Sequence, residues 1–342
     1  MLQPHQYIER TSGAVRNETL FGDRIIRLVY APVRENAPLL FRALTGARST
    51  RILALFNYDL TLGRRLLGND RFLQECGVDL GECLDPPEQL DTARKVFERK
   101  IRYWDCRPLP EASGGVYSPA DARVLTGCFC NQRQLFLKGK FFDLEELLGD
   151  RENWLEAFTD GEFAIFRLTP DKYHYNHVPV SGKVVDFYDI DGTFHSCNPS
   201  AIVHQVTPYS KNRRVVTVID TDVPGGTGVG LVAMIEIVAL MIGEIVQCYS
   251  EHRYDDPVPV SAGQFLRAGC PKSLYRPGSS TDVLIFQPNR VRIADDLLRN
   301  QVRCDVNSRF SSGFGRPLVE TDVQVRSLIA RSTCVTDADE RR

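Results

Sequence analysis

Two histidines three positions apart are the side chains of this 342-residue sequence best suited to chemistry. His174 and His177 lie in the segment 173–179, Tyr-His-Tyr-Asn-His-Val-Pro. On a helix, this spacing would place both imidazoles on one face, where they could hold a metal ion. Pro179 and the valines on either side of it instead favour an extended segment. No third ligand follows at a metal-like spacing, so we expect no metal. Taken alone, the pair fits ordinary burial as well as catalysis.

Further segments carry groups that could act together with these histidines. Asp121 stands in a proline-bounded turn before a strand-like run, and a lysine–glycine segment runs into a helix that Asp143 could cap. The small-residue turn Gly278-Ser279-Ser280-Thr281 leads into the apolar run Val283-Leu284-Ile285-Phe286. Together with the histidine segment, they resemble, in the same order, the marker segments of the phosphatidylserine decarboxylase family. The resemblance covers about 101–286, and its segments are 117–124, 137–149, 167–174 and 277–286.

The resemblance implies an enzyme that makes its own cofactor. Asp121, His177 and Ser280 match the family's Asp-His-Ser set, in which a base accepts the serine proton and an acid orients the base. The serine hydroxyl attacks the preceding carbonyl, and the resulting ester eliminates to dehydroalanine. Hydrolysis then leaves a pyruvoyl group at the start of the C-terminal (α) fragment, here 280–342. This fragment stays bound to the N-terminal (β) fragment because its first strand belongs to the core.

The second stage implied by the resemblance is the decarboxylation itself. The pyruvoyl ketone condenses with the substrate amine and takes up the electrons that carbon dioxide leaves behind, as pyridoxal phosphate does in other enzymes. A positioned acid must then return a proton to the carbon. By analogy with the family, we assign this step to His174 and self-cleavage mainly to His177.

The doubled serine leaves two candidates for the scissile bond. When the family pattern is aligned on the strand that ends at Phe286, the nucleophile falls at Ser280, with cleavage between Ser279 and Ser280. The family's preference for a glycine carbonyl favours Ser279 and the bond after Gly278. A second departure is Ala122, where the family commonly has glycine, which matters only if the turn demands a positive φ.

The distribution of residue types predicts an α+β chain. Residues 1–110 are expected to be a helical N-terminal region, including one helix over Asp91–Tyr103 that Arg107–Pro110 ends. Residues 111–330 alternate short β-branched and aromatic runs with glycine and proline, which predicts a β-rich catalytic domain like a barrel or sandwich. Residues 331–342 are expected to be a flexible tail. The five predicted strands are 163–168, 182–190, 215–219, 232–240 and 283–286.

Composition sets limits on partners and location. The net charge of −2 and the absence of interleaved basic and aromatic residues argue against nucleic acid. The apolar run 229–246 contains two glutamates, so we expect buried strands rather than a membrane span.

Residues 37–68 carry five arginines against one aspartate. They suit either a helix pair on an anionic membrane surface or a packed helical hairpin with a solvated face. We expect reduced cysteines in a cytoplasmic protein that is peripheral on the membrane.

Three functions remain open at this point. The first is a decarboxylase that converts phosphatidylserine of an anionic membrane surface into phosphatidylethanolamine. The second keeps the pyruvoyl chemistry but acts on a soluble amino acid. The third is an unprocessed, non-catalytic homologue in which the doubled serine has abolished cleavage. The resemblance also allows a homodimer.

Overall fold

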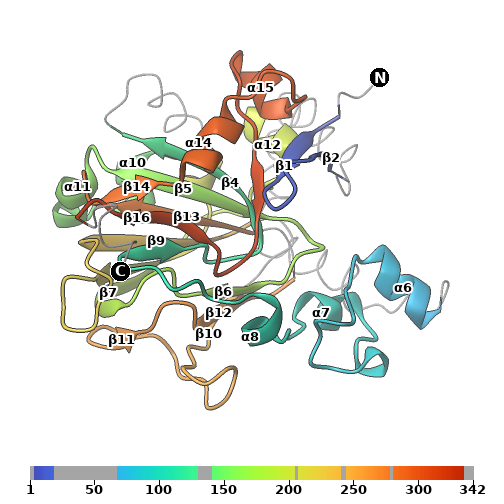
Figure 1. The fold of residues 1–342 in the computed structure, drawn as a ribbon. Helices are drawn as coiled ribbons and strands as arrows, with labels where there is room; N and C mark the ends of the chain where they lie inside the picture. Colours follow the sequence, from blue (N-terminus) through green and yellow to red (C-terminus); the bar gives the residue numbers. More distant parts are fainter. Residues whose placement is uncertain are drawn as a thin grey trace.

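The computed structural model describes residues 4–18, 68–129, 141–204, 207–239, 244–277 and 280–334. At its centre lies an open ten-stranded sheet with the order β11-β7-β8-β9-β13-β5-β4-β15-β1-β2 (Figure 1). Neighbouring strands are antiparallel except β1 and β15, which are parallel. The strands are β1 (Gln6–Glu9), β2 (Val15–Asn17), β4 (Ala122–Cys128), β5 (Glu162–Leu168), β7 (Gly182–Ile190), β8 (Arg214–Asp220), β9 (Leu231–Val238), β11 (Phe265–Leu266), β13 (Ser280–Phe286) and β15 (Thr321–Val323).

Two three-stranded sheets accompany the central one, in the orders β10-β12-β6 and β14-β16-β3. Their strands are β3 (Gly115–Tyr117), β6 (Tyr175–His177), β10 (Ile245–Gln247), β12 (Pro271–Tyr275), β14 (Val291–Ile293) and β16 (Leu328–Ser332). The helices of the described residues are short: α6 (Asn69–Glu75), the 3₁₀ helix η3 (Pro87–Gln89), α7 (Ala93–Phe97), α8 (Tyr103–Cys106), α10 (Leu144–Leu148), α11 (Glu152–Phe158), α12 (Pro199–His204), α13 (Pro208–Lys211), α14 (Asp295–Gln301) and α15 (Arg309–Phe314).

Both faces of the middle strands of the central sheet, β5, β8, β9 and β13, are buried, which makes three layers. Successive side chains of a strand point to opposite faces, and on β13 Leu284 joins one core cluster while Val283 joins the other. The Leu284 cluster includes residues of the small sheets, such as Tyr275 of β12. The Val283 cluster includes residues of α10 to α13 and α15. Burial on both faces explains why the central strands read as nearly continuous apolar runs.

All five predicted strands are present, and they correspond to β5, β7, β8, β9 and β13. The glycine-rich stretch 225–230 forms the loop between β8 and β9, and Gly225, Gly228 and Gly230 have positive φ there. Asp143 caps α10, since its Oδ1 accepts a hydrogen bond of 3.0 Å from the Glu146 amide. The β-rich character of the catalytic region is therefore confirmed.

The expectation of a barrel is wrong. The central sheet ends in β11 on one side and β2 on the other, so it is open, and the chain forms stacked layers. Closure would require its two end strands to pair with each other. The helical N-terminal region is not confirmed either. The first described residues form the β1–β2 hairpin, which extends the central sheet because Ile8 pairs with Thr321 of β15.

Only the first part of the helix predicted over 91–103 is present. Thr92 caps α7 by accepting a hydrogen bond from the Lys95 amide, and α7 ends at Phe97. The Arg99 guanidinium then donates to the Val96 carbonyl, and Ile101 forms a β-bridge with Cys83 before α8 begins. Extended pairing at Ile101 cannot coexist with a continuous helix. The separate helix α8 begins at Tyr103, where the predicted helix ends, and itself ends at Cys106, just before Arg107–Pro110.

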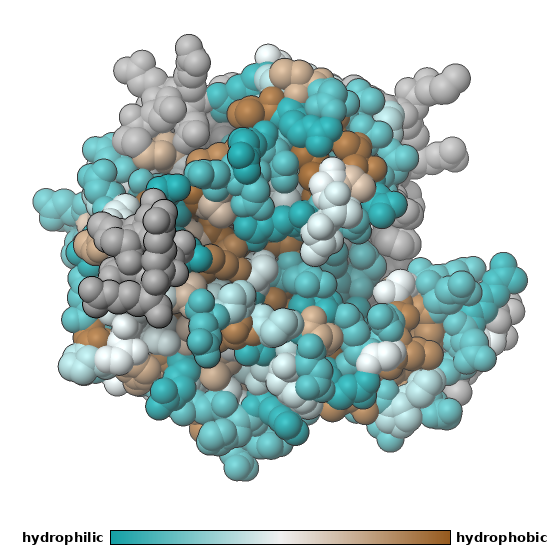
Figure 2. All heavy atoms as spheres, in the orientation of Figure 1, coloured by the Kyte–Doolittle hydropathy of each residue, from teal (hydrophilic) through white to brown (hydrophobic). Residues whose placement is uncertain are grey.

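The surface bears on the expected membrane contact. No helix of the described residues is long and apolar enough to cross a membrane. The face drawn in Figure 2 is mostly hydrophilic, and its apolar residues lie in several separate groups. The arginine-rich segment 37–68 lies outside the described residues apart from Gly68, so contact through it stays a prediction. Most cysteines in the described part of the chain are free thiols, as expected, but Cys128 is disulfide-bonded.

Candidate active site

The two histidines flank a short buried strand. His177 ends β6 and His174 immediately precedes it, so the extended conformation predicted for this segment is confirmed. Both side chains are fully buried. The His174 ring stacks on Phe97 with centroids 3.5 Å apart, whereas the His177 ring meets the edge of Tyr103 at 4.7 Å. The two imidazoles therefore have different neighbours.

His177 is held in one tautomer by its two hydrogen bonds. Its Nδ1 lies 2.8 Å from the Gly269 carbonyl oxygen, which can only accept, so Nδ1 carries the proton. Its Nε2 lies 3.0 Å from the Tyr173 hydroxyl, which must then donate. Burial lowers the pKa of His177 to about 3, so the imidazole is neutral at pH 7. Nε2 is consequently the only nitrogen of this ring able to accept a proton.

The contacts of Tyr173 continue away from His177. The Tyr173 hydroxyl lies 2.8 Å from the Tyr254 hydroxyl, which is the donor of this pair because Tyr173 donates to His177, and the Tyr254 oxygen accepts from the Ile101 amide at 3.2 Å. Sequence reasoning did not select either tyrosine. Tyr173 directly precedes His174 in the printed sequence, but Tyr254 is 81 positions from Tyr173, and nothing in the sequence pairs them.

Neither ring nitrogen of His174 makes a close hydrogen bond among the described residues, and its nearest polar neighbour is the Lys172 backbone. Burial, assisted by the charge of Arg99, lowers its pKa to about 3, so it is also neutral at pH 7. Its backbone is fixed to β12, because the Tyr275 amide donates to the His174 carbonyl at 3.1 Å. An unpartnered buried imidazole is costly for the fold, and such groups concentrate at functional sites.

Asp121 lies in the predicted turn before β4, but its hydrogen bonds go to other groups than His177. Its carboxylate accepts from the Arg107 guanidinium at 3.1 and 2.9 Å and from the Val325 amide at 2.7 Å. Burial alone would raise the pKa of Asp121, but the Arg107 charge and hydrogen bonds outweigh burial and lower it. The turn still reaches His177 through the backbone, since the His177 amide donates to the Pro119 carbonyl at 2.7 Å.

Ser280 opens β13 in the middle of the central sheet. Its backbone is in register with Leu168 of β5 and Val238 of β9, and its buried Oγ has no hydrogen-bond partner in the described part of the chain. Ser280 and Asp282 share one face of the strand. Asp282 accepts a 2.7 Å hydrogen bond from the hydroxyl of Tyr275, so this face looks toward the sheet that holds the histidines. Gly278, Ser279 and the lysine–glycine residues 138–140 lie outside the described residues.

Ala122, the departure after the acid, needs no special backbone. It is the first residue of β4 and is not among the described residues with positive φ. The methyl group is accommodated in an extended strand, so the turn that carries Asp121 does not require glycine at this position.

A buried charged pair ties the histidine sheet to the central sheet. Lys272 of β12 donates to Glu236 of β9 at 2.6 Å, and both side chains are fully buried. Asn176, which lies between the two histidines, also donates to Glu236, at 3.1 Å. Burial would raise the pKa of Glu236, but Lys272 and the hydrogen bonds lower it. Sequence reasoning noted Glu236 only as an argument against a membrane span and missed Lys272.

One group in the described part of the chain has the donor set for a metal ion, but it is far from the histidines in sequence. It comprises His5, Glu18 and Glu320. Arg167 already binds both carboxylates, donating to Glu18 and Glu320 at 2.6 Å each. A cation would have to displace this guanidinium, so the cluster is better described as a buried ion-pair network. It joins the N-terminal hairpin to β5.

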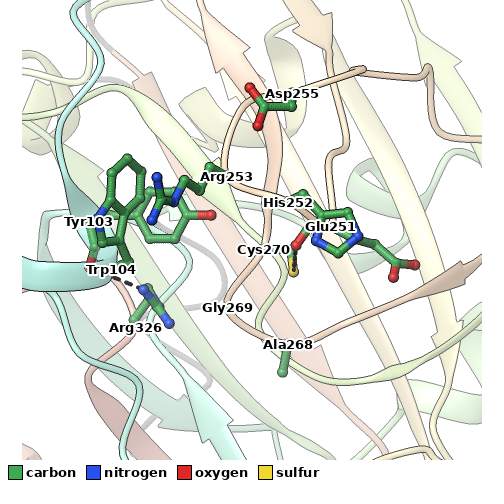
Figure 3. Close-up of a pocket in the computed structure, with 10 residues that line it drawn as sticks. All are labelled: Tyr103, Trp104, Glu251, His252, Arg253, Asp255, Ala268, Gly269, Cys270 and Arg326. Carbon is green, nitrogen blue, oxygen red and sulfur yellow. Dashed lines mark hydrogen bonds between the residues drawn. The ribbon is translucent and has the colours of Figure 1, made fainter. Parts of the chain in front are cut away.

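A cavity of about 380 Å³ opens beside His177. Gly269, whose carbonyl fixes the His177 tautomer, belongs to its wall, and so does Tyr103, whose ring meets the His177 ring. Figure 3 shows Arg253 and Arg326 on the same side of the cavity as Tyr103 and Trp104. A polar, partly open cavity therefore adjoins one of the two histidines.

The comparison with known families shows which family the chain belongs to. The model of the phosphatidylserine decarboxylase family matches residues 93–311, well over half of the chain. The chain belongs to this family. It is therefore a carboxy-lyase family member, and Asp121, His174, His177 and Ser280 all fall within the matched region.

Individual relatives agree with the family assignment. A phosphatidylserine decarboxylase proenzyme of Fusobacterium nucleatum is 27% identical over 304 residues, which cover 86% of this chain and 91% of the relative. One of Bordetella petrii is 31% identical over 238 residues, covering 66% of this chain and 79% of the relative. One of Chlamydia trachomatis is 27% identical over 326 residues, covering 90% and 98%. The similarity thus extends beyond the catalytic region.

Proposed function

We propose that the chain cleaves itself at Ser280, or at the adjacent Ser279, and then decarboxylates phosphatidylserine to phosphatidylethanolamine. Membership of the phosphatidylserine decarboxylase family carries this proposal, and the relatives are themselves named proenzymes. The neutral His177 beside a partly open cavity supports it, since a base for self-cleavage must be unprotonated.

Self-cleavage gives specific roles to His177, Tyr173 and Asp121. His177 receives the serine proton at Nε2, because Gly269 keeps Nδ1 protonated. The serine hydroxyl must therefore take the place that the Tyr173 hydroxyl holds at Nε2. Asp121 supports the imidazolium through its charge, which raises the pKa of His177 against the effect of burial. Its own ionised state is maintained by Arg107.

The surroundings of Ser280 suit a pyruvoyl group. Its hydroxyl makes no hydrogen bond among the described residues, so losing this hydroxyl, as Cα becomes the ketone carbon and Cβ the methyl group, would break none. A pyruvoyl group supplies an electron sink for the carboxylate-bearing carbon. Within this framework, His174 is the group that returns a proton to that carbon, and its unpartnered nitrogens leave it available for this role.

The proposal also includes contact with a membrane surface and formation of a homodimer. The arginine excess of 37–68 motivates binding to an anionic surface. Flotation of the purified protein with vesicles of phosphatidylserine and phosphatidylcholine tests this contact, with vesicles of phosphatidylcholine alone as the control. The molar mass of the protein, measured by light scattering as it elutes from a size-exclusion column, tests the homodimer.

The substrate is tested by activity on two forms of serine. Purified protein is incubated with phosphatidylserine in detergent micelles and, separately, with free serine, and carbon dioxide release is measured. We expect release from the lipid only. Release from free serine alone would favour the soluble amino acid as substrate. An inert chain that stays whole would mean a non-catalytic homologue.

A further inference from the structure

Two arginines line the cavity beside His177 without forming an ion pair among the described residues. Arg326 lies 4.8 Å from the centroid of the Tyr103 ring and donates to the Tyr103 carbonyl at 3.1 Å. Its buried Nε finds no hydrogen-bond partner within the described ranges. Arg253 lies 4.0 Å from the centroid of the Trp104 ring. Stacking on aromatic faces holds guanidinium groups in place while leaving their N–H edges available.

The carboxylates of the cavity do not neutralise this pair. Glu251 is bound by Arg267 at 2.9 Å and also accepts from Tyr249. In Figure 3, Asp255 stands apart from Arg253 and Arg326, and no ion pair joins it to either arginine among the described residues. The side of the cavity next to Tyr103 and Trp104 therefore carries two guanidinium groups that form no ion pair among the described residues.

The position of the cavity relates this charge to the catalytic residues. Gly269 contributes to the wall and binds His177 Nδ1 through its carbonyl. The Tyr103 ring contacts the His177 ring and also carries the Arg326 guanidinium. A molecule held by Arg326 would thus lie near the aromatic ring that His177 contacts. The volume of about 380 Å³ lies within the range of small-molecule sites.

We propose that Arg253 and Arg326 bind the phosphate of the substrate headgroup in this cavity. A guanidinium fork matches two phosphate oxygens, and such charge-assisted bonds are stronger than neutral ones. This inference rests on the proposed function, because it names the site that would hold the phosphodiester of a serine phospholipid. It makes Arg253 and Arg326 binding residues, and it assigns them no part in self-cleavage.

The direct test measures binding without turnover. Purified protein is titrated by calorimetry with glycerophosphoethanolamine, the product headgroup, which has no carboxylate to lose. Inorganic phosphate is titrated in a parallel experiment. Arg326→Ala and Arg253→Ala should each weaken headgroup binding by about 10- to 100-fold, the range for losing a charge-assisted hydrogen bond. If Arg326→Ala does not fold, Arg326→Lys, which retains the charge but not the guanidinium fork, is titrated in its place. Arg303→Ala is the matched control, because Arg303 lies on the surface and pairs with Asp305.

Enzyme kinetics separate an effect on headgroup binding from an effect on catalysis or on self-cleavage. The KM for phosphatidylserine should rise in the Arg253 and Arg326 variants while kcat and the extent of self-cleavage stay near the parent values. Unchanged headgroup affinity in both variants would overturn the proposal. Binding of inorganic phosphate that does not compete with the lipid would overturn it too, since the site would then be one for free phosphate. If the parent chain fails to cleave itself, the proposed function fails, but the titrations still report on the arginine pair.

Discussion

His174 and His177 occupy different environments, and this difference is what separates their proposed roles. His177 has both nitrogens engaged, with Gly269 and Tyr173, and so presents one defined basic atom. His174 has neither nitrogen engaged among the described residues. A group that must act on one specific hydroxyl benefits from a fixed tautomer, while a group that meets a changing substrate needs open donors and acceptors.

Substitution of each histidine should affect a different step. His177→Gln should leave the chain whole, because no base remains to accept the serine proton. His174→Gln should still give two fragments on a denaturing gel but should lower decarboxylation by about 10²- to 10⁴-fold, the usual contribution of a proton-transfer group. Cleavage that survives in His177→Gln and fails in His174→Gln would reverse the assignment.

Asp121 should be needed for stability as well as for processing. Asp121→Asn removes the charge that faces the buried Arg107 guanidinium, and breaking a buried pair in this way costs about 3–5 kcal/mol. The urea midpoint should therefore fall strongly at an unchanged slope. Glu82→Gln is the matched control, because Glu82 binds the same guanidinium from a more exposed position and should cost about 1 kcal/mol or less. Equal losses in the two variants would contradict the prediction.

At the scale of elements, β6 and β12 position the histidines, and β9 and β13 position the serine. The Lys272–Glu236 pair bridges these two sets of strands. Tyr275 bridges them as well, since its amide binds the His174 carbonyl and its hydroxyl lies 3.1 Å from the Thr281 carbonyl. The relative position of histidine and serine is therefore set by strand packing rather than by a loop.

Loss of the buried lysine should loosen this connection. Lys272→Met leaves Glu236 buried without its cation, which should lower the free energy of unfolding by about 3–5 kcal/mol. Adding Glu236→Gln to Lys272→Met should recover a large part of that loss, because no unpaired charge then remains. Urea denaturation of the parent, the single variant and the double variant gives the comparison. A double variant less stable than the single one would argue against a charge effect.

The sequence predicted the central strands well and the connections poorly. A strand buried on both faces reads as an apolar run, so β5, β8, β9 and β13 were recognised, while the partly exposed β7 was recognised by its β-branched and aromatic residues. The helix over 91–103 was overextended because its apolar spacing does not reveal that Ile101 pairs with Cys83. The motif residues were found by resemblance, but their partners were not. Asp121 binds Arg107 and His177 binds Gly269 only because the fold brings distant segments together.

At the scale of the whole molecule, buried titrating groups should make stability depend on pH. The folded pKa of His174 and His177 is about 3, below the unfolded value near 6.5. Between these values the unfolded chain binds two protons that the folded chain does not, so stability is lost as the pH falls. Asp282 acts in the opposite direction, because burial and the charge of Glu236 raise its pKa well above 3.8 and it retains a proton in the fold.

Between about pH 4.5 and 6, the unfolded chain binds two more protons than the folded chain at the histidines and one fewer at Asp282. The unfolded chain therefore binds one proton more in total at these three groups. Stability should therefore fall by about 1.4 kcal/mol for each pH unit on acidification over this window. Urea midpoints at pH 7.5, 6, 5 and 4.5 measure the trend. Asp282→Asn removes the opposing group and should steepen the slope by about the same amount again. A midpoint that stays constant from pH 7.5 to 4.5 would show that the histidines are not buried as neutral groups.

The intact mass of the purified chain tests self-cleavage next to Ser280 most directly. The account predicts two fragments in the parent protein, with the smaller one running from Ser280 to Arg342 and beginning with a pyruvoyl group. Ser280→Ala should then give one uncleaved mass, whereas Ser279→Ala should still be cut. If instead the smaller fragment begins at residue 279, and Ser279→Ala is the variant that stays whole, the scissile bond is Gly278–Ser279. A parent protein of single intact mass that nevertheless decarboxylates phosphatidylserine would contradict the account.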